Sequence, residues 1–191
     1  MTSSVLKFGD AIKLAWTERT RRGPTVLFAD TRKAWRARKR IIECRDANCI
    51  DLYIDESKPY NVSELVAALE MVRTFVSDEF GLIACNGAVV PSLAFAAELF
   101  PAKIVLANPE PCEQDLGFNA VSQKTFPDLQ NVRGIKVIHE RNDAFSEGIV
   151  QEIASHNGNI KRLRVSEFSN ILSNIIKSPG YVGSFASTLK P

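Results

Sequence analysis

A buried strand, a tight turn and an apolar helix decide the fold, and this stretch reads Phe80-Gly-Leu-Ile-Ala-Cys-Asn-Gly-Ala-Val-Val-Pro-Ser-Leu-Ala-Phe-Ala-Ala-Glu-Leu-Phe-Pro101. We expect the strand over residues 81–85, the turn at Asn86-Gly87 and the helix over 88–100. Another apolar strand, residues 103–108, follows at once. This succession is the unit of a parallel α/β sheet, in which sites are built in the turns after the strands. The first place to look for chemistry is therefore Asn86.

The length and composition predict one globular domain. The chain has 191 residues, of which 45% are apolar and 24% charged, enough to build a substantial core. We expect a single domain over 1–191, with an N-terminal helix in 1–24, an α/β core in 25–165 and a C-terminal helix and tail in 166–191. No segment reaches the roughly 20 apolar residues of a membrane span, and the N-terminus lacks the pattern of a secretory signal.

The cysteines predict reduced thiols. Cys44, Cys49, Cys85 and Cys112 form no CxxC pair, and the chain has only two histidines. A zinc site is therefore poorly supplied, and we expect no metal and no cofactor. Thiols that are not arranged in pairs are typical of a cytoplasmic protein, and we expect this location.

Strand and helix patterns alternate along the chain. An amphipathic helix is expected over 4–20, because Val5, Phe8, Ile12 and Trp16 recur at helical spacing. Six strands are expected at 25–29, 49–54, 81–85, 103–108, 135–138 and 160–165, and helices at 31–42, 62–76, 88–100, 146–156 and 167–177. Such alternation predicts a parallel sheet with helices on both faces. Residues 108–132 are rich in proline and read as a long loop or lid.

From residue 25 to 165 the chain resembles the core of the α/β-hydrolase fold. Residues 81–98 are similar to the strand, nucleophile elbow and helix of that family, and residues 103–109 to its next strand. Val-Ile-His-Glu-Arg-Asn-Asp-Ala-Phe145 is similar to the strand and loop that present the family's acid. The resemblance implies a three-layer sandwich with a six-stranded, mostly parallel sheet of order 2-1-3-4-5-6. It would lack the family's leading antiparallel strands.

The same resemblance implies a degenerate active site. The family uses a Gly-x-Ser-x-Gly elbow, an acid and a late histidine, with an oxyanion hole of backbone amides. Here the elbow is Ala-Cys-Asn-Gly-Ala88, which puts Asn86 at the nucleophile and Asp143 at the acid, and the loop 166–170 holds no histidine. An asparagine amide is not a nucleophile. The family's fold thus suggests a pseudoenzyme, a non-catalytic accessory domain that binds a small ligand or a protein.

Two interpretations of this site remain open. An anionic or carbonyl-containing ligand could bind at the turns after the first and third expected strands, through Asp30, Thr31, Asn86, Gly87 and Ala88. Alternatively, the chain is an atypical hydrolase or acyl-transfer enzyme that acts on an ester or thioester. Its nucleophile would then be Cys85 or a water activated by Asp143.

Each candidate catalytic residue also has a structural interpretation. If Cys85 were the nucleophile, one residue before the expected position, His139 or His156 would serve as its base. Cys85 otherwise reads as a core cysteine, and Asp143 as a turn residue.

Charge is concentrated near the N-terminus. Residues 1–45 carry twelve Lys/Arg and four acidic residues, whereas the remainder carries twelve and eighteen. A basic helix within this segment could present one interaction face, composed of Arg32, Trp35, Arg36, Lys39 and Arg40. This face is either simply solvated or binds an acidic protein partner. No nucleic-acid-binding motif is present, so nucleic acid is not the expected partner, and a homodimer stays open.

Overall fold

The computed structural model describes residues 3–17, 25–31, 48–76, 80–99, 101–112, 129–130 and 132–166. Their elements are β1 (Ser3–Phe8), β2 (Ile12–Thr17), β3 (Thr25–Asp30), β4 (Asn48–Ile54), α2 (Val62–Phe75), β5 (Phe80–Cys85), the 3-10 turn η2 (Asn86–Ala88), α3 (Val89–Leu99), β6 (Lys103–Ala107), β7 (Ile135–Glu140), α4 (Ala144–His156) and β8 (Ile160–Val165).

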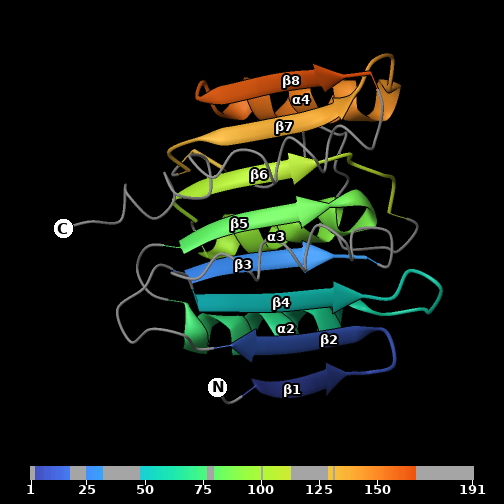
Figure 1. Ribbon diagram of the computed structural model, residues 1–191, viewed down its shortest axis with the longest axis vertical. Helices are drawn as coiled ribbons and strands as arrows, with labels where there is room; N and C mark the ends of the chain where they lie inside the picture. Colours follow the sequence, from blue (N-terminus) through green and yellow to red (C-terminus); the bar gives the residue numbers. More distant parts are fainter. Residues whose placement is uncertain are drawn as a thin grey trace.

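The strands form one mixed sheet of eight, in the order β1-β2-β4-β3-β5-β6-β7-β8. Strand β2 is antiparallel to both of its neighbours, and the strands from β3 to β8 are parallel to one another (Figure 1). The expected number of six strands is therefore wrong, because two further strands, β1 and β2, extend the sheet beyond β4.

These two strands come from the segment predicted to be an N-terminal helix. They form a hairpin in which Phe8 pairs with Ile12 and Ser3 with Thr17. The turn is made by Gly9, whose φ of 59° lies in the left-handed region that glycine adopts without strain. A Cβ on Gly9 would also overlap with the carboxylate of Glu64 in α2. The leading antiparallel strands that the sequence seemed to lack are thus present.

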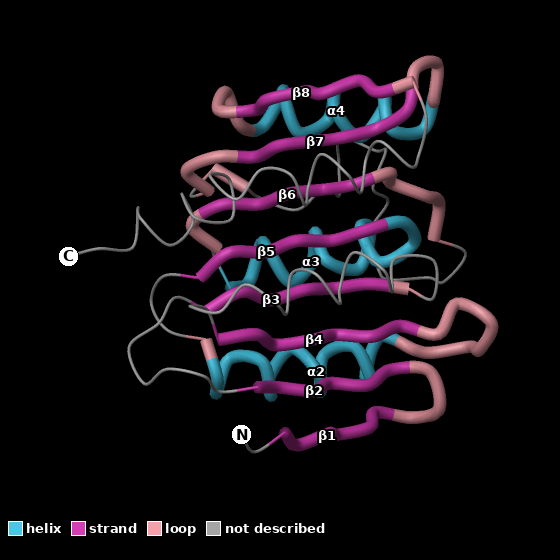
Figure 2. The backbone as a smooth tube through the Cα atoms, in the orientation of Figure 1, coloured by secondary structure: helices cyan, strands magenta, loops and turns pink. Residues whose placement is uncertain are grey.

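The three described helices lie on one face of the sheet (Figures 1 and 2). Helix α2 connects β4 with β5, α3 connects β5 with β6, and α4 connects β7 with β8. All three crossovers move along the sheet in the same direction, so a common hand places them on the same side. The helices predicted at 31–42 and 167–177 lie outside the described residues, as does most of the predicted lid at 108–132.

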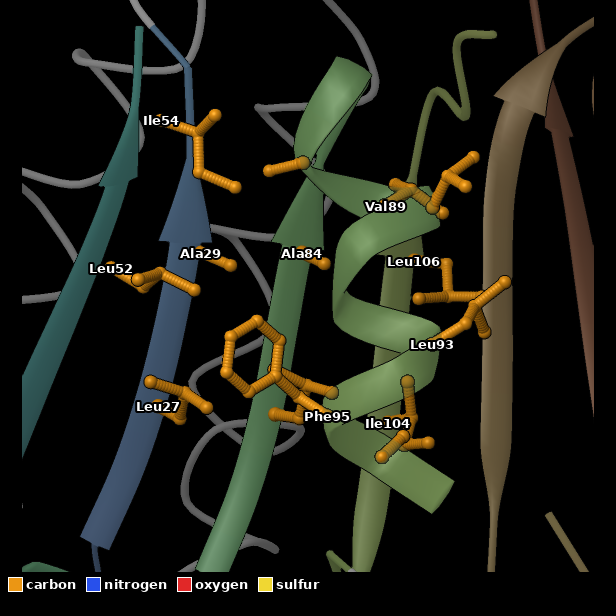
Figure 3. Packing of buried hydrophobic residues seen from close by; sticks show 14 of the residues in the cluster. Leu27, Ala29, Leu52, Ile54, Ala84, Val89, Leu93, Phe95, Ile104 and Leu106 are labelled. Atoms are coloured by element: carbon orange, nitrogen blue, oxygen red, sulfur yellow. The ribbon is translucent and has the colours of Figure 1, made fainter. Parts of the chain in front are cut away.

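Both faces of the sheet are buried. Leu82 and Ala84 of β5 belong to the hydrophobic cluster that α2, α3 and α4 cover, and Figure 3 shows part of this layer around α3. Ile83 and Cys85 alternate with them and are also at most 1% exposed. Such strands, apolar on both sides, are typical of the centre of an α/β sheet.

The carboxyl ends of β3, β5, β6, β7 and β8 meet at one edge of the sheet, at the arrowheads in Figure 1. The turns that follow them hold Thr31, the segment 86–88, the segment 108–112 and the segment 141–143. These turns contain five of the residues that the sequence marks as functional: Thr31, Asn86, Gly87, Ala88 and Asp143.

Candidate functional site

Asn86 is the apex of the turn between β5 and α3. Its φ is 54°, a left-handed conformation that few residues other than glycine and asparagine adopt readily. Its side chain is buried, with 0% exposure, and its backbone oxygen accepts a hydrogen bond from the N–H of Val89. The sharp strand-to-helix turn expected of a nucleophile elbow is therefore present, with an amide at its apex.

An asparagine in the left-handed conformation follows each of three neighbouring strands. Asn86, Asn108 and Asn142 have φ values of 54°, 52° and 66° and come after β5, β6 and β7. Asparagine tolerates this region because its short side chain can hydrogen-bond locally. The three turns thus share a left-handed asparagine, so that polar residues follow three neighbouring strands at their carboxyl ends.

Two of these asparagines contact each other. The Nδ2 atom of Asn108 donates to Oδ1 of Asn86 at 3.0 Å and lies 3.3 Å from Oε1 of Glu110. The Nδ2 atom of Asn86 itself is buried and has no hydrogen-bond partner among the described residues. An unsatisfied buried donor costs about 1–3 kcal/mol, so a ligand or water acceptor at this position would stabilise the site.

Thr31 lies beside the elbow. Ala29 of β3 pairs with Ala84 of β5, and continuing this parallel register by two residues brings Thr31 opposite Asn86. The Thr31 hydroxyl is buried, and within the described part of the chain it too has no hydrogen-bond partner. Two unsatisfied polar atoms therefore lie at neighbouring strand ends.

Asp143 is the N-cap of α4. Its Oδ1 accepts hydrogen bonds from the backbone N–H groups of Phe145 (3.1 Å) and Ser146 (3.3 Å), and its Oδ2 accepts one from the Ser146 hydroxyl. The Ser146 hydroxyl also lies 3.4 Å from the carbonyl oxygen of Pro109, which directly follows Asn108. Asp143 is thus linked to the Asn86–Asn108 pair, and the cap gives its carboxylate a structural role as well.

The thiol that could act as nucleophile is buried. Cys85 is the last residue of β5, is 1% exposed and lies on the face of the strand away from α3. Burial in apolar surroundings is typical of a structural cysteine.

Neither histidine reaches the elbow. His139 is completely buried on the α4 side of β7, where its Nε2 accepts from Nε of Arg162 at 3.1 Å and its Nδ1–H donates to the carbonyl oxygen of Glu140 at 2.8 Å. Burial is the main cause that lowers the pKa of His139, which keeps the ring neutral. His156 ends α4, twelve residues after its first, so about 18 Å of helix separate it from the carboxyl edge.

Two further contacts at this edge were not expected from the sequence. A Cβ on Gly87 would overlap with the carboxylate of Glu56, which therefore lies against the elbow. The hydroxyl of Tyr60 lies 3.3 Å from Sγ of Cys112, and burial, followed by this bond, raises the pKa of Tyr60. Glu56, Glu110 and Cys112 thus add carboxylates and a thiol to the candidate site.

The remaining predicted residues give less structural information. Ala88 is buried within η2, and Asp30 ends β3 with a side chain that the structure does not describe. The predicted interaction face, composed of Arg32, Trp35, Arg36, Lys39 and Arg40, lies outside the described residues. Within the described ranges no group of three or more His, Cys, Asp or Glu is placed to hold a metal ion. No described helix is long and apolar enough to cross a membrane.

Several solved structures share this architecture. An esterase from Pyrococcus furiosus has a TM-score of 0.63 at 13% identity, with 98% of this chain and 91% of that one covered. A serine hydrolase without a lid from Xanthomonas campestris has a TM-score of 0.60 at 15% identity, with 99% and 95% covered. A thioesterase domain from the curacin biosynthetic pathway has a TM-score of 0.57 at 10% identity, with 93% and 98% covered. No protein-family model and no curated protein sequence matches the chain.

The chain therefore has an α/β-hydrolase-like fold. At these identities the likeness shows the fold alone. The structural neighbours cover nearly the whole chain, and the sheet includes the antiparallel strands at its beginning, so the fold is more complete than the sequence indicated.

Proposed function

We propose that the turn between β5 and α3 binds the carbonyl oxygen of an ester or thioester, with the side-chain amide of Asn86 as a hydrogen-bond donor. One observation carries this proposal: Nδ2 of Asn86 is buried at the elbow with no acceptor among the described residues. A pre-positioned donor in a buried site is what a developing oxyanion requires. Asn86 thus occupies the family's nucleophile position but does different chemistry there.

The reaction we propose is hydrolysis or acyl transfer by an atypical route. The resemblance in fold to esterases and a thioesterase favours this class. Since Asn86 is not a nucleophile, water would add to the carbonyl carbon and give its proton to the carboxylate of Asp143. The bond from the carbonyl carbon to the alcohol oxygen or thiol sulfur would then break, and the leaving group would take up that proton.

The second candidate function is binding without turnover, as in an accessory domain. The engagement of Asp143 as a helix cap and the burial of Cys85 favour it, because both side chains already have structural roles. In this case the elbow holds a carbonyl or carboxylate ligand and releases it unchanged.

Steady-state hydrolysis of p-nitrophenyl esters and of short acyl thioesters tests the two candidates. Asn86→Asp removes the donor at constant size, and Asp143→Asn removes the base but keeps an oxygen that can cap α4. Matched controls are Asn159→Asp and Asp10→Asn, because both residues are exposed and lie outside the elbow.

If hydrolysis is the function, kcat/KM falls by about 100-fold in Asn86→Asp, as expected for loss of an oxyanion donor. Both control variants should retain the activity of the unmodified chain. The accessory-domain function would be supported if no variant shows turnover, the unmodified chain binds a non-reactive ketone analogue, and Asn86→Asp weakens this binding. The absence of both turnover and ligand binding would overturn the site assignment.

We further propose that the basic N-terminal segment recruits an acidic protein partner. The charge asymmetry of the sequence supports this, since two separate arginines, Arg36 and Arg40, would share a helical side. Reversal of both charges to glutamate should abolish capture of such a partner at low salt. A partner that stays bound to the doubly reversed variant would contradict this.

A further inference from the structure

A cavity of about 350 Å³ opens at the carboxyl ends of β7 and β8, beside the first turn of α4. Arg141, Asn142, Glu147 and Arg164 line it. Its volume lies within the range of sites that bind small molecules. Neither Asn86 nor its partner Asn108 is among the described lining residues, although Asp143 directly follows the lining residue Asn142.

Positive charge dominates the surroundings of the cavity. Arg162 and Arg164 project from β8 toward Glu147, the one carboxylate among the described lining residues, with Nη2 of Arg164 3.2 Å from its Oε1 and Nη2 of Arg162 in contact with the same atom. Arg141 adds a third guanidinium. Among these four side chains, three guanidinium groups face one carboxylate, which leaves two positive charges unbalanced.

The contacts of His139 determine which arginine side chains face the cavity. Its neutral ring accepts a hydrogen bond from Nε of Arg162, and its Nε2 lies 3.9 Å from Oε1 of Glu147. Arg162 is thus held between His139 and Glu147, away from the lining. Burial, and after it the nearby charge of Arg164, lowers the pKa of Arg162. Arg141 and Arg164 are left to face the cavity.

We propose that this cavity binds a small molecule through a phosphate group, held by the guanidinium groups of Arg141 and Arg164. Guanidinium donors bind phosphate oxygens in paired, charge-assisted hydrogen bonds. A dianionic phosphate monoester matches the two unbalanced charges, whereas a carboxylate would neutralise only one. The amide of Asn142 adds donors at the rim. This site stands independently of the one proposed at the elbow.

Titration with inorganic phosphate, followed by calorimetry or by amide NMR shifts, tests the proposal, with acetate as the comparison anion. The variants are Arg141→Gln and Arg164→Gln. Lys161→Gln is the matched control, since Lys161 is an exposed cation of β8 that alternates with Arg162 and Arg164 and does not line the cavity. Arg141 forms no ion pair within the described part of the chain, so its variant keeps the test valid even if Arg164→Gln fails to fold.

Phosphate should bind the unmodified chain more tightly than acetate, and each arginine substitution should weaken it by about tenfold, the effect of one lost charge-assisted contact. Lys161→Gln should change the affinity by less than a factor of about two, as a screened surface charge does. The site would be overturned if Arg141→Gln leaves the phosphate affinity unchanged, or if Lys161→Gln lowers this affinity as much as the arginine substitutions do. Acetate that binds as tightly as phosphate would overturn the phosphate assignment.

Discussion

Replacing Asn86 by alanine and by glycine separates the backbone conformation of the elbow from the side-chain contacts of this residue. With φ at 54°, alanine would pay about 1–2 kcal/mol for the left-handed conformation, a cost that glycine avoids. Glycine in turn loses about 0.4–1 kcal/mol more through the entropy of its unfolded chain. Both variants lose the hydrogen bond from Asn108, so this loss cancels in the comparison.

The net expectation is that Asn86→Ala is less stable than Asn86→Gly by about 0.5–1 kcal/mol. Urea unfolding followed by tryptophan fluorescence measures the two free energies of unfolding. The matched control is the same pair of substitutions at Asn159, which is exposed and has a negative φ. There the order should reverse, with glycine less stable than alanine.

An alanine variant at Asn86 that equals or exceeds the glycine variant in stability would refute the reasoning. It would mean that the turn does not hold residue 86 in the left-handed conformation. The reasoning would also be refuted if the alanine and glycine variants had the same order of stability at Asn86 as at Asn159.

Three further outcomes are expected. Asp143→Ala should lower the free energy of unfolding by about 1 kcal/mol through loss of the α4 cap, while Asp143→Asn should cost less; equal losses in urea unfolding would contradict the capping role. Burial lowers the pKa of His139 in the folded chain, so the unfolded chain binds a proton at this histidine first as the pH falls below about 6.5. The free energy of unfolding should therefore decrease as the pH falls below this value. His139→Gln should remove this part of the pH dependence, measured by urea unfolding at a series of pH values. Gly87→Ala should displace the Glu56 carboxylate, and a double-mutant cycle with Glu56→Ala should show coupling; additive free energies would mean that the two residues do not touch.

The sequence predicts the parallel part of the fold because its signals there are local. Residues 80–107 carry a continuous apolar strand, an Asn-Gly turn and an apolar helix, and the structure shows β5, η2, α3 and β6 in these places. The hairpin of β1 and β2 was missed since Val5, Phe8, Ile12 and Trp16 fit a helical period as well as two short strands. Gly9 was the signal for the turn, which its φ of 59° makes. The closeness of Glu64 to Gly9 could not be foreseen, because the two residues are distant in sequence.

Part of the candidate site could also be predicted, and part could not. The left-handed apex at Asn86 follows from the Asn-Gly pair after a strand, and the position of Asp143 follows from its place after β7. The hydrogen bond between Asn86 and Asn108 could not be foreseen, because it joins two turns across neighbouring strands. The contact of Glu56 with Gly87 is likewise long-range. Asparagines after β5, β6 and β7 were a signal for this edge that was visible in the sequence.

The most direct test of the central claim is the NMR signal of the Asn86 side-chain amide during titration with a non-hydrolysable ketone analogue of an ester. If Nδ2 of Asn86 donates to a ligand carbonyl, its proton signal should move downfield with the same saturation curve as overall binding. The side-chain amide of the exposed Asn159 should stay in place. Saturable binding that leaves the Asn86 amide signal unmoved would contradict the account.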